Sequence, residues 1–279
     1  MSARLCWGIF RERAHSPGRE SDDAEILRLT AKALEARGYV VHLREPDDFD
    51  VPEGDRPGHV LLMGERVPLL QTLRGWEARG TRVVNTPEAV LNTYRERMLT
   101  LWSEAGVLVP ESRTVGTAEV VGPASAPVWV KRADVHNTQE GDVVFAPTSE
   151  AVATALAGLR ERSIPRAVIQ AHLAGDLVKF YGVGALPRPN DAAPWFRWFY
   201  HRDQRLAGHP FEEAQLVEVA RRAAHALGLE IFGGDAIVPA GGALRLIDLN
   251  AWPSFALYRD EAAAEIARYL DLRFAADSA

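Results

Sequence analysis

Short apolar runs alternate with amphipathic stretches through the first third of the chain. Residues 5–10 form an apolar run of strand length, and residues 23–37 carry apolar side chains at helical spacing. Gly38 follows that stretch, in the position where glycine commonly ends a helix. The pattern recurs with strand-like runs at 39–43, 60–63 and 82–84 and a helical stretch at 67–79. This alternation predicts a parallel sheet with helices packed on it.

The pattern changes at Thr86-Pro87-Glu88, where a capping residue precedes a proline suited to the first helical position. We expect one helix from there to Ala105. We therefore predict an α/β protein of three units: a small Rossmann-like parallel-sheet domain at residues 1–86, and α+β subdomains at 87–170 and 171–279. Within the last two units, strands are expected at 112–115, 128–131, 143–145, 168–170, 177–183, 195–200, 231–238 and 243–249, and helices at 149–162, 211–227 and 260–270.

Composition and charge narrow the class of protein. Hydrophobic residues make up 47% and charged residues 25% of the 279 residues, as in an ordinary soluble globular protein. The net charge of −6 gives no bulk attraction to nucleic acid or to an anionic membrane, so we expect neither partner. No apolar run approaches the roughly 20 residues of a membrane-spanning helix, and the N-terminal run is too short for a signal peptide. The single cysteine, Cys6, cannot form an internal disulfide, and we expect a cytoplasmic protein.

The segment 232–250 carries the clearest chemical signal. Gly241-Gly242 is typical of a hairpin turn, which sets Asp235 opposite Asp248 on one face of the two strands. Asn250 lies two residues further and projects from the same face. Facing carboxylates repel by up to roughly 1 kcal/mol when solvated, and a hard cation such as Mg²⁺ offsets that repulsion. The alternative is a different register, or carboxylates that are solvated or paired with arginine.

Lysine is rare in this chain, which makes its positions informative. Only three of the 32 basic residues are lysines, and two of them, Lys131 and Lys179, lie inside apolar strand-like runs. Arginine serves almost everywhere else, so these two positions indicate a need for a compact ammonium, for example against a phosphate oxygen. The alternative is that each lysine lies on the solvated face of its strand.

Weaker signals lie between these runs. Gln170 ends an apolar strand, and Asp176 follows a short linker. This arrangement can bind adenine and ribose, or Gln170 can be incidental to a core strand. The loop 132–142 contains His136, Asn137 and one glycine, so it can close on phosphates through backbone N–H groups without being a glycine-rich phosphate loop. No Gly-x-x-x-x-Gly-Lys, Gly-x-Gly-x-x-Gly, His-Glu-x-x-His or zinc-ligand spacing occurs.

Several short blocks follow one another along nearly the whole chain. They are Asn85-Thr-Pro-Glu88, Tyr94-Arg-Glu-Arg97, Gly106-Val-Leu-Val-Pro110, residues 128–131, residues 168–176, and Asp235 with Asp248-Leu-Asn250-Ala-Trp-Pro253. In this order they resemble the ATP-grasp superfamily, in particular its glutathione-synthetase-like and ribosomal-protein-glutamate-ligase-like branch. The resemblance implies a fold in which two α+β subdomains clasp ATP beside the N-terminal domain.

The resemblance also implies roles for single residues. Lys131 and Lys179 would contact the nucleotide phosphates, and Arg97 stands where the family usually has a phosphate-binding lysine. Adenine would be held by Gln170 and by the backbone of Ala171, His172 and Leu173, and ribose by Asp176. One or two Mg²⁺ ions would be bound by Asp235, Asp248 and Asn250.

These features predict a carboxylate–amine ligase that works through an acyl phosphate, with Lys131, Lys179 and Arg197 as catalytic candidates. Its partners would be a small-molecule acid and a small-molecule amine, and a homo-oligomer is left open. The substrates would lie between loop 11–19 and the last unit, and loops 11–20 and 186–194 are expected to define them. Candidate carboxylate anchors are Arg11, Arg13 and Arg19, for which a solvated loop is an equal alternative, and Arg197 and His201 are further candidates.

Two other functions stay open at this stage. A small-molecule kinase of the inositol-phosphate-kinase type shares the Asp-x-Asn pattern and a strand similar to Leu177-Val-Lys-Phe-Tyr181, although the acidic net charge mildly disfavours a polyanionic substrate. The other is a nucleotide-binding module without catalysis, against which the three oxygen ligands and the two lysines weigh.

Overall fold

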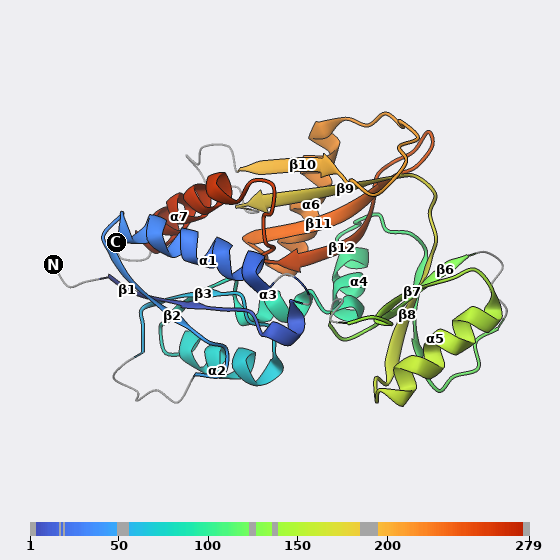
Figure 1. The fold of residues 1–279 in the computed structure, drawn as a ribbon, viewed down its shortest axis with the longest axis horizontal. Helices are drawn as coiled ribbons and strands as arrows, with labels where there is room; N and C mark the ends of the chain where they lie inside the picture. The colour runs from blue at the N-terminus through green and yellow to red at the C-terminus, as the bar shows by residue number, and fades with distance from the viewer. Residues whose placement is uncertain are drawn as a thin grey trace.

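The computed structural model describes residues 4–16, 18, 20–48, 56–122, 127–135, 139–184 and 195–275. The described chain folds around three four-stranded sheets, one parallel and two antiparallel (Figure 1). This confirms the predicted α/β class with α+β parts after the first sheet. The predicted unit limits at residues 86 and 170 stay predictions. None of the helices in the described ranges has the length and apolar character needed to cross a membrane.

The first sheet is built from the N-terminal alternation of strands and helices. Its strand order is β2-β1-β3-β4, and all neighbouring strands run parallel. The predicted helical stripe is buried at Ile26, Leu27 and Leu34, and Gly38 beyond it has a positive φ of 87°. The elements are β1 (Arg4–Ile9), the 3-10 turn η1 (Arg13–His15), α1 (Glu20–Glu35), β2 (Tyr39–Arg44), β3 (His59–Leu62), α2 (Val67–Glu77) and β4 (Arg82–Val84).

The single helix expected after Thr86 is two helices, α3 (Pro87–Asn92) and α4 (Arg95–Glu104). Thr86 caps the first as predicted, because its hydroxyl accepts a backbone hydrogen bond of 3.1 Å from the first turn. Between the helices Tyr94 has an extended backbone, and its hydroxyl donates to the carbonyl of Glu65 at 3.0 Å. This contact with the loop after β3 accompanies the break in the helix.

The second sheet has the order β5-β8-β6-β7 and is antiparallel throughout. One face packs on α5 through residues such as Val130 and Ile169. The alternation along each strand therefore places Lys131 and Gln170 on the opposite face. The elements are β5 (Ser112–Gly116), β6 (Val128–Arg132), β7 (Val143–Ala146), α5 (Ser149–Glu161) and β8 (Arg166–Ala171).

The third sheet has the order β10-β9-β11-β12, again antiparallel. Phe180 and Phe232 belong to one of its faces, which packs on α6. On the side of the opposite face, α7 packs against α1 of the first unit (Figure 1). The elements are β9 (Asp176–Val183), β10 (Phe196–Tyr200), α6 (Glu213–Leu227), β11 (Ile231–Val238), β12 (Arg245–Ala251) and α7 (Arg259–Ala275).

The cores of the three units are unequal. The first and third sheets and their helices share two hydrophobic clusters, in which Trp7 and Leu70 join Phe180 and Phe232, and Leu27 joins Ile266. The second sheet and α5 have a cluster of their own. The first and third sheets therefore belong to one packed body, which also includes α3 and α4, and the second sheet with α5 is a lobe beside it (Figure 1).

Asn85 links the first unit to the start of β11. It is 0% exposed, its Nδ2 donates to the Ile231 carbonyl at 2.7 Å, and its Oδ1 accepts from the N–H groups of Glu230 and Ile231 at 2.8 and 2.9 Å. One side chain thus satisfies three backbone groups of the strand that leads to Asp235.

We expect Asn85→Ala to lower the free energy of unfolding by about 3 kcal/mol, because three backbone groups lose their partner. Asn92→Ala is the matched control, since Asn92 donates a single bond of 3.1 Å to the Leu227 carbonyl and should cost about 1 kcal/mol. Urea unfolding measures both. Equal losses in the two variants would contradict this role of Asn85.

Candidate functional site

A row of side chains crosses the third sheet on the face opposite α6. Strand register places Phe199, Lys179, Asp235 and Asp248 side by side in that order. The predicted pairing of Asp235 with Asp248 is therefore confirmed. Asn250, opposite Gly233, lies on the same face two residues further along β12.

The register differs from the prediction on the side of the turn. Ala236 pairs with Leu246, so Ile247 is an extra residue and forms a β-bulge beside Asp235. The Ile247 carbonyl accepts a hydrogen bond of 3.3 Å from Nζ of Lys131, which comes from the second sheet. A two-residue alternation in the sequence does not predict this bulge, because Lys131, which binds the bulged carbonyl, belongs to another sheet.

Gly233 and Gly234 allow the strands to approach closely at this point. A Cβ on Gly233 would lie 2.6 Å from Cγ of Pro253, and a Cβ on Gly234 would lie 2.5 Å from the Asp248 carbonyl oxygen. Both distances are shorter than real Cβ contacts, so side chains here would push β12 away from Asp235. The two glycines thus have a packing role in placing the carboxylates.

Three cations surround the two carboxylates. Nζ of Lys179 lies 2.7 Å from Oδ1 of Asp235, and Nη2 of Arg95 lies 3.6 Å from Oδ2 of Asp248. Lys131 approaches from the second sheet, with its Nζ 2.8 Å from Oε1 of Gln170. The repulsion between the carboxylates is therefore offset by cationic side chains of the protein, which leaves the cluster one positive charge in excess.

Lys131 is the most deeply buried of the three lysines, at 6% exposed. Burial lowers the pKa of Lys131 to about 8; Asp248 and Asp235 act to raise it, and Arg95 lowers it further. An ammonium held in this way is desolvated in advance of any ligand. It can therefore give an anion a strong interaction at a small further desolvation cost.

Arg95 was not among the residues predicted from the sequence. It is 2% exposed, and its Nη1 donates to the carbonyls of Arg132 and Val135 at 3.2 and 2.7 Å, at the start of the loop after β6. Arg97, which was predicted for the phosphate position, instead forms an ion pair with Glu88 on the surface. The helical spacing carries a usable signal, because Arg95 shares the buried face of α4 with Met98 and Trp102 whereas Arg97 does not.

The residues predicted to hold adenine lie at the end of β8. Gln170 is 3% exposed and bridges Lys131 and Ser112, and its Nε2 lies 3.1 Å from the Ser112 hydroxyl. The N–H groups of Ala171 and His172 donate to the carbonyls of Glu111 and Pro127 at 2.8 and 2.9 Å. Leu173 forms no hydrogen bond with the described residues.

The ring of His172 lies in an aromatic group with Trp129 and Phe145. Trp129 Nε1 is 3.2 Å from His172 Nδ1, and the ring centroid of Phe145 lies 5.2 Å from those of both partners. Trp129 is directly opposite Gln170 in the register, so this group borders the strand end predicted for adenine.

Asp176, predicted to contact ribose, binds backbone groups of a neighbouring segment. Its two carboxylate oxygens accept from the N–H groups of Ala207 and His209 at 2.6 and 2.8 Å. Burial acts to raise the pKa of Asp176, but these backbone donors and that of Gly208 outweigh it and lower the pKa. The side chain thus anchors the segment after β10.

Arg197 and His201 lie at the edge of the third sheet. Arg197 shares the face of Lys179, but it pairs with Glu261 of α7 and lies over the Trp195 ring at 5.4 Å. His201 Nδ1 accepts a hydrogen bond of 3.3 Å from the Asp203 N–H. Neither side chain joins the charged cluster in the described contacts.

Of the N-terminal candidates, Arg11 is buried and Arg13 is exposed. A cavity of about 480 Å³ opens beside them, and both arginines line it together with Ser16, Asp23 and Arg28. Its mixed charge is compatible with a polar ligand. Arg19, His136, Asn137 and the whole of loop 186–194 lie outside the described residues.

The oxygens of Asp235, Asp248 and Asn250 suit a hard cation. Asp235 and Asp248 are 26% and 19% exposed, and the described contacts leave Oδ2 of Asp235 without a hydrogen bond. Carboxylate and amide oxygens of this kind fit Mg²⁺ that keeps part of its water or phosphate shell. Among the described residues, no group of three or more His, Cys, Asp and Glu side chains is arranged to hold a metal ion. A metal here would therefore also need the Asn250 amide and water or phosphate oxygens as ligands.

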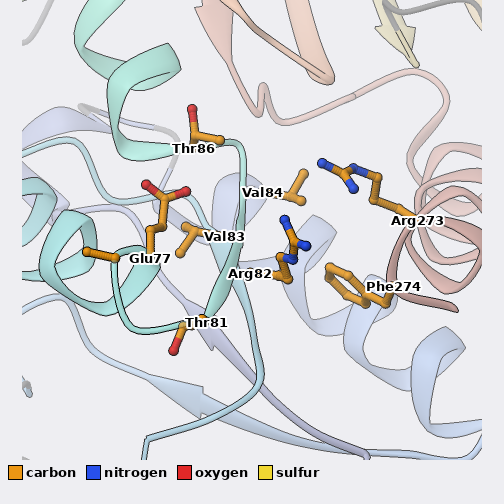
Figure 2. Close-up of a pocket in the computed structure, with 10 residues that line it drawn as sticks. Glu77, Thr81, Arg82, Val83, Val84, Thr86, Arg273 and Phe274 are labelled. Atoms are coloured by element: carbon orange, nitrogen blue, oxygen red, sulfur yellow. The ribbon is translucent and has the colours of Figure 1, made fainter. Parts of the chain in front are cut away.

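A separate cavity of about 400 Å³ lies away from this cluster, between α2, β4 and the end of α7. Figure 2 shows Arg82 and Arg273 extending toward the same part of it, next to Val84. Glu77 also lines it, and burial raises the pKa of Glu77 to about 7, with Arg74 and Arg82 acting to lower it.

The fold and the cluster can be set beside known proteins. No family model matches the chain, and no curated protein matches its sequence. Solved structures with a similar fold include a D-alanine–D-alanine ligase from Bacillus anthracis, at a TM-score of 0.71 and 13% identity over 99% of this chain and 100% of that one. A D-alanyl-alanine synthetase A from Vibrio cholerae has a TM-score of 0.72 and 11% identity over 99% and 98%. A RimK domain ATP-grasp protein from Sphaerobacter thermophilus has a TM-score of 0.67 and 18% identity over 95% and 98%. The chain therefore has the ATP-grasp fold.

We expect Lys131→Met to stabilise the ligand-free protein at pH 7 by about 1 to 2 kcal/mol, because the cost of burying the charged ammonium disappears. The lowered pKa means that this cost is fully present below pH 8 and is relieved as pH rises toward 10.5. The advantage of the variant should therefore shrink between pH 7 and pH 10 in urea unfolding. Lys32→Met, at the exposed lysine of α1, is the control, and a Lys131→Met variant that is less stable than this control would refute the expectation.

Glu77 gives a second pH dependence, of opposite sign. Because the folded pKa of about 7 exceeds the usual 4.5, folding favours the protonated acid, and stability falls as pH rises through this window. Glu77→Gln should match the wild type near pH 4.5 and exceed it at pH 8 by on the order of 1 kcal/mol after solvent screening. Urea midpoints at the two pH values test this, with the exposed Glu104→Gln as control. A constant difference between the variants across pH would show that Glu77 does not titrate in this range.

Proposed function

We propose that this protein is an ATP- and Mg²⁺-dependent carboxylate–amine ligase that acts through an acyl phosphate. The observation that carries the proposal is the cluster of Arg95, Lys131 and Lys179 around Asp235 and Asp248, where the second sheet faces the third. The ATP-grasp fold supports it, and the similar structures include a D-alanine–D-alanine ligase and a D-alanyl-alanine synthetase A by name. A further structure of the Bacillus anthracis ligase, at 12% identity to this chain, is a complex with ATP.

The nucleotide phosphates would lie against the three cations. The cluster has three positive and two negative side chains, so it attracts a polyanion and cannot by itself neutralise a triphosphate. One or two Mg²⁺ ions bound with the nucleotide would supply the remaining positive charge. Arg95 takes the phosphate-side role in this proposal, and Arg97, paired with Glu88, has none.

Asp235, Asp248 and Asn250 would hold the metal. When bound, Mg²⁺ neutralises phosphate charge and orients the transferred phosphoryl group. Lys179 already neutralises one oxygen of Asp235, and its release from that oxygen would let it turn toward a phosphate. Asp176 stays an anchor of the segment after β10, and adenine would lie by the aromatic group at the end of β8.

The proposed reaction has two steps. A substrate carboxylate oxygen attacks the γ-phosphorus of ATP, the bond to the bridging oxygen breaks, and ADP leaves. A neutral amine then attacks the acyl carbon, phosphate leaves, and the amine nitrogen loses a proton to solvent. Lys131, Lys179 and Arg95 stabilise the charge that develops on the phosphoryl oxygens in the first step. Arg197 and the cavity beside Arg13 are candidate positions for substrate contacts.

A small-molecule kinase is the second candidate, favoured by the Asp248-x-Asn250 pattern and by Lys179 on its strand. A polyanionic acceptor needs further cations, whereas Arg95, Lys131 and Lys179 would all be occupied by the nucleotide. The ligase therefore stands first.

The test is a screen of pooled carboxylic acids and amines with Mg·ATP, in which phosphate release and product mass are read together. The wild type should release ADP and phosphate only when both an acid and an amine are present. Asp248→Ala should lower the rate by at least about 100-fold, because the Mg²⁺ that neutralises phosphate charge would lose one of its proposed ligands. Asp203→Ala, at an exposed carboxylate of the same unit, should leave it unchanged.

Other outcomes decide between the functions. A phosphorylated product that accumulates without free phosphate, and without need of an amine, would establish the kinase. Binding of Mg·ATP without product from any pool would indicate a nucleotide-binding module. An Asp248→Ala variant with wild-type binding and turnover would remove the proposed site altogether.

A further inference from the structure

The turn that follows Asn250 has an unusual backbone. Trp252 and Phe255 have positive φ values of 44° and 50°, although neither residue is glycine. Bulky residues rarely adopt this region, and when they do the surrounding structure must hold them there. Both side chains are 0% exposed. The turn therefore begins directly beyond a predicted metal ligand and needs restraint from outside its own sequence.

Arg11, from the loop after β1, supplies that restraint. Its Nη2 donates to the carbonyls of Ala251 and Trp252, each at 2.9 Å. Its Nη1 donates to Oδ2 of Asp23 at 3.0 Å, and its Nε lies 3.3 Å from Oε1 of Glu65. The side chain is only 8% exposed. One guanidinium thus joins the turn to α1 and to the loop after β3.

The charge of Arg11 is secured by its surroundings. Burial acts to lower the pKa of Arg11, but Glu65, Asp23 and Glu12 together raise it above its usual value. The acids are themselves held in place, since Ser16 donates to Asp23 at 2.6 Å and Glu12 accepts from the Glu65 N–H at 3.0 Å. The donor group is therefore both charged and oriented.

Arg259 binds the same turn at its other end. Its Nε donates to the Ser254 carbonyl at 3.3 Å, and its Nη2 donates to Oδ1 of Asp22 at 2.7 Å. Asp22 and Asp23 are adjacent in the first turn of α1. Two arginines anchored on one helix therefore hold three carbonyls of the turn, and Arg11 is the more buried of the two.

The contacts of Arg11 separate it from a substrate anchor. All three of its guanidinium nitrogens face protein oxygens, which leaves little surface for the carboxylate ligand that the sequence suggested. Its position suits a different task, because the two carbonyls that it holds are the first two after Asn250.

We propose that Arg11 is a positioning residue for the nucleotide–metal site: it fixes the turn 251–255 so that Asn250, at the end of β12, projects into the cluster with Asp235 and Asp248. This inference rests on the proposed function, and it assigns the first unit a direct part in shaping the metal site of the third. Loss of a residue that orients a metal ligand typically weakens metal affinity by about 10- to 100-fold.

The test uses the full chain and compares Arg11→Ala, Arg11→Lys and Arg4→Lys. Calorimetry measures the affinity for ATP with Mg²⁺ and with a chelator in its place. Arg11→Ala and Arg11→Lys should weaken Mg·ATP binding by at least about 10-fold and change metal-free ATP binding by less than about 2-fold. Millimolar guanidinium should restore part of the Mg·ATP affinity of Arg11→Ala, because the ion can occupy the vacated site between the carbonyls and the acids.

Arg4→Lys is the matched control. Arg4 also joins the first unit to α7, with its Nη1 3.1 Å from Asp271 Oδ1, but it does not contact the turn. It should bind Mg·ATP as the wild type does. If Arg11→Ala does not fold, as judged by circular dichroism, Arg11→Lys decides the matter.

The outcomes keep the two proposals apart. A wild-type protein that fails to bind Mg·ATP would remove the proposed function. If the wild type binds Mg·ATP and both Arg11 variants bind it with the same affinity as the wild type, the positioning role alone would be overturned. Equal weakening of binding with and without Mg²⁺ would also overturn it, since that pattern indicates a general loss of structure.

Discussion

Two carboxylates on neighbouring strands, Asp235 and Asp248, require positive charge close by, and the arrangement of the site follows from that requirement. Each of the three nearby cations comes from a different element: Lys179 from β9, Arg95 from α4 and Lys131 from β6. Because like charges repel more strongly away from bulk water, none of these groups can be moved without disturbing the others. The charge balance thus ties the second unit to the third at the place where chemistry is proposed.

The distribution of the cores gives this polar contact its importance. The first and third sheets share two hydrophobic clusters, whereas the described residues of the second sheet and α5 form a hydrophobic cluster of their own. Hydrophobic burial therefore holds the first and third sheets together, and the lobe of the second sheet and α5 depends more on directional contacts such as that of Lys131 with the Ile247 carbonyl. A ligand that binds between the sheets and interacts with these groups would add to the attachment of the lobe.

The sequence predicts those parts of the site that depend on local periodicity. The pairing of Asp235 with Asp248 follows from the hairpin turn and a period of two. Both lysines on strands lie near these carboxylates, and their contact with phosphate stays a prediction. The bulge at Ile247 was missed because its partner belongs to another sheet. Arg95 was missed because the helix was expected to be continuous, although Met98 and Trp102 mark its buried face. The burial of Arg11 depends on carbonyls 240 residues away, and no local pattern encodes that distance.

The charge balance of the proposed site also bears on the order in which metal and nucleotide would bind. Lys179 neutralises Asp235 and Arg95 lies near Asp248, so a lone divalent cation would meet carboxylates that already have positive neighbours. In the proposed site a nucleotide would change this balance, because its phosphates would attract the lysines and the arginine and leave the carboxylate oxygens to the metal. Metal and nucleotide binding would therefore be coupled through the same side chains, and each would raise the affinity for the other. The geometry thus favours entry of the metal together with the nucleotide over a metal site filled in advance.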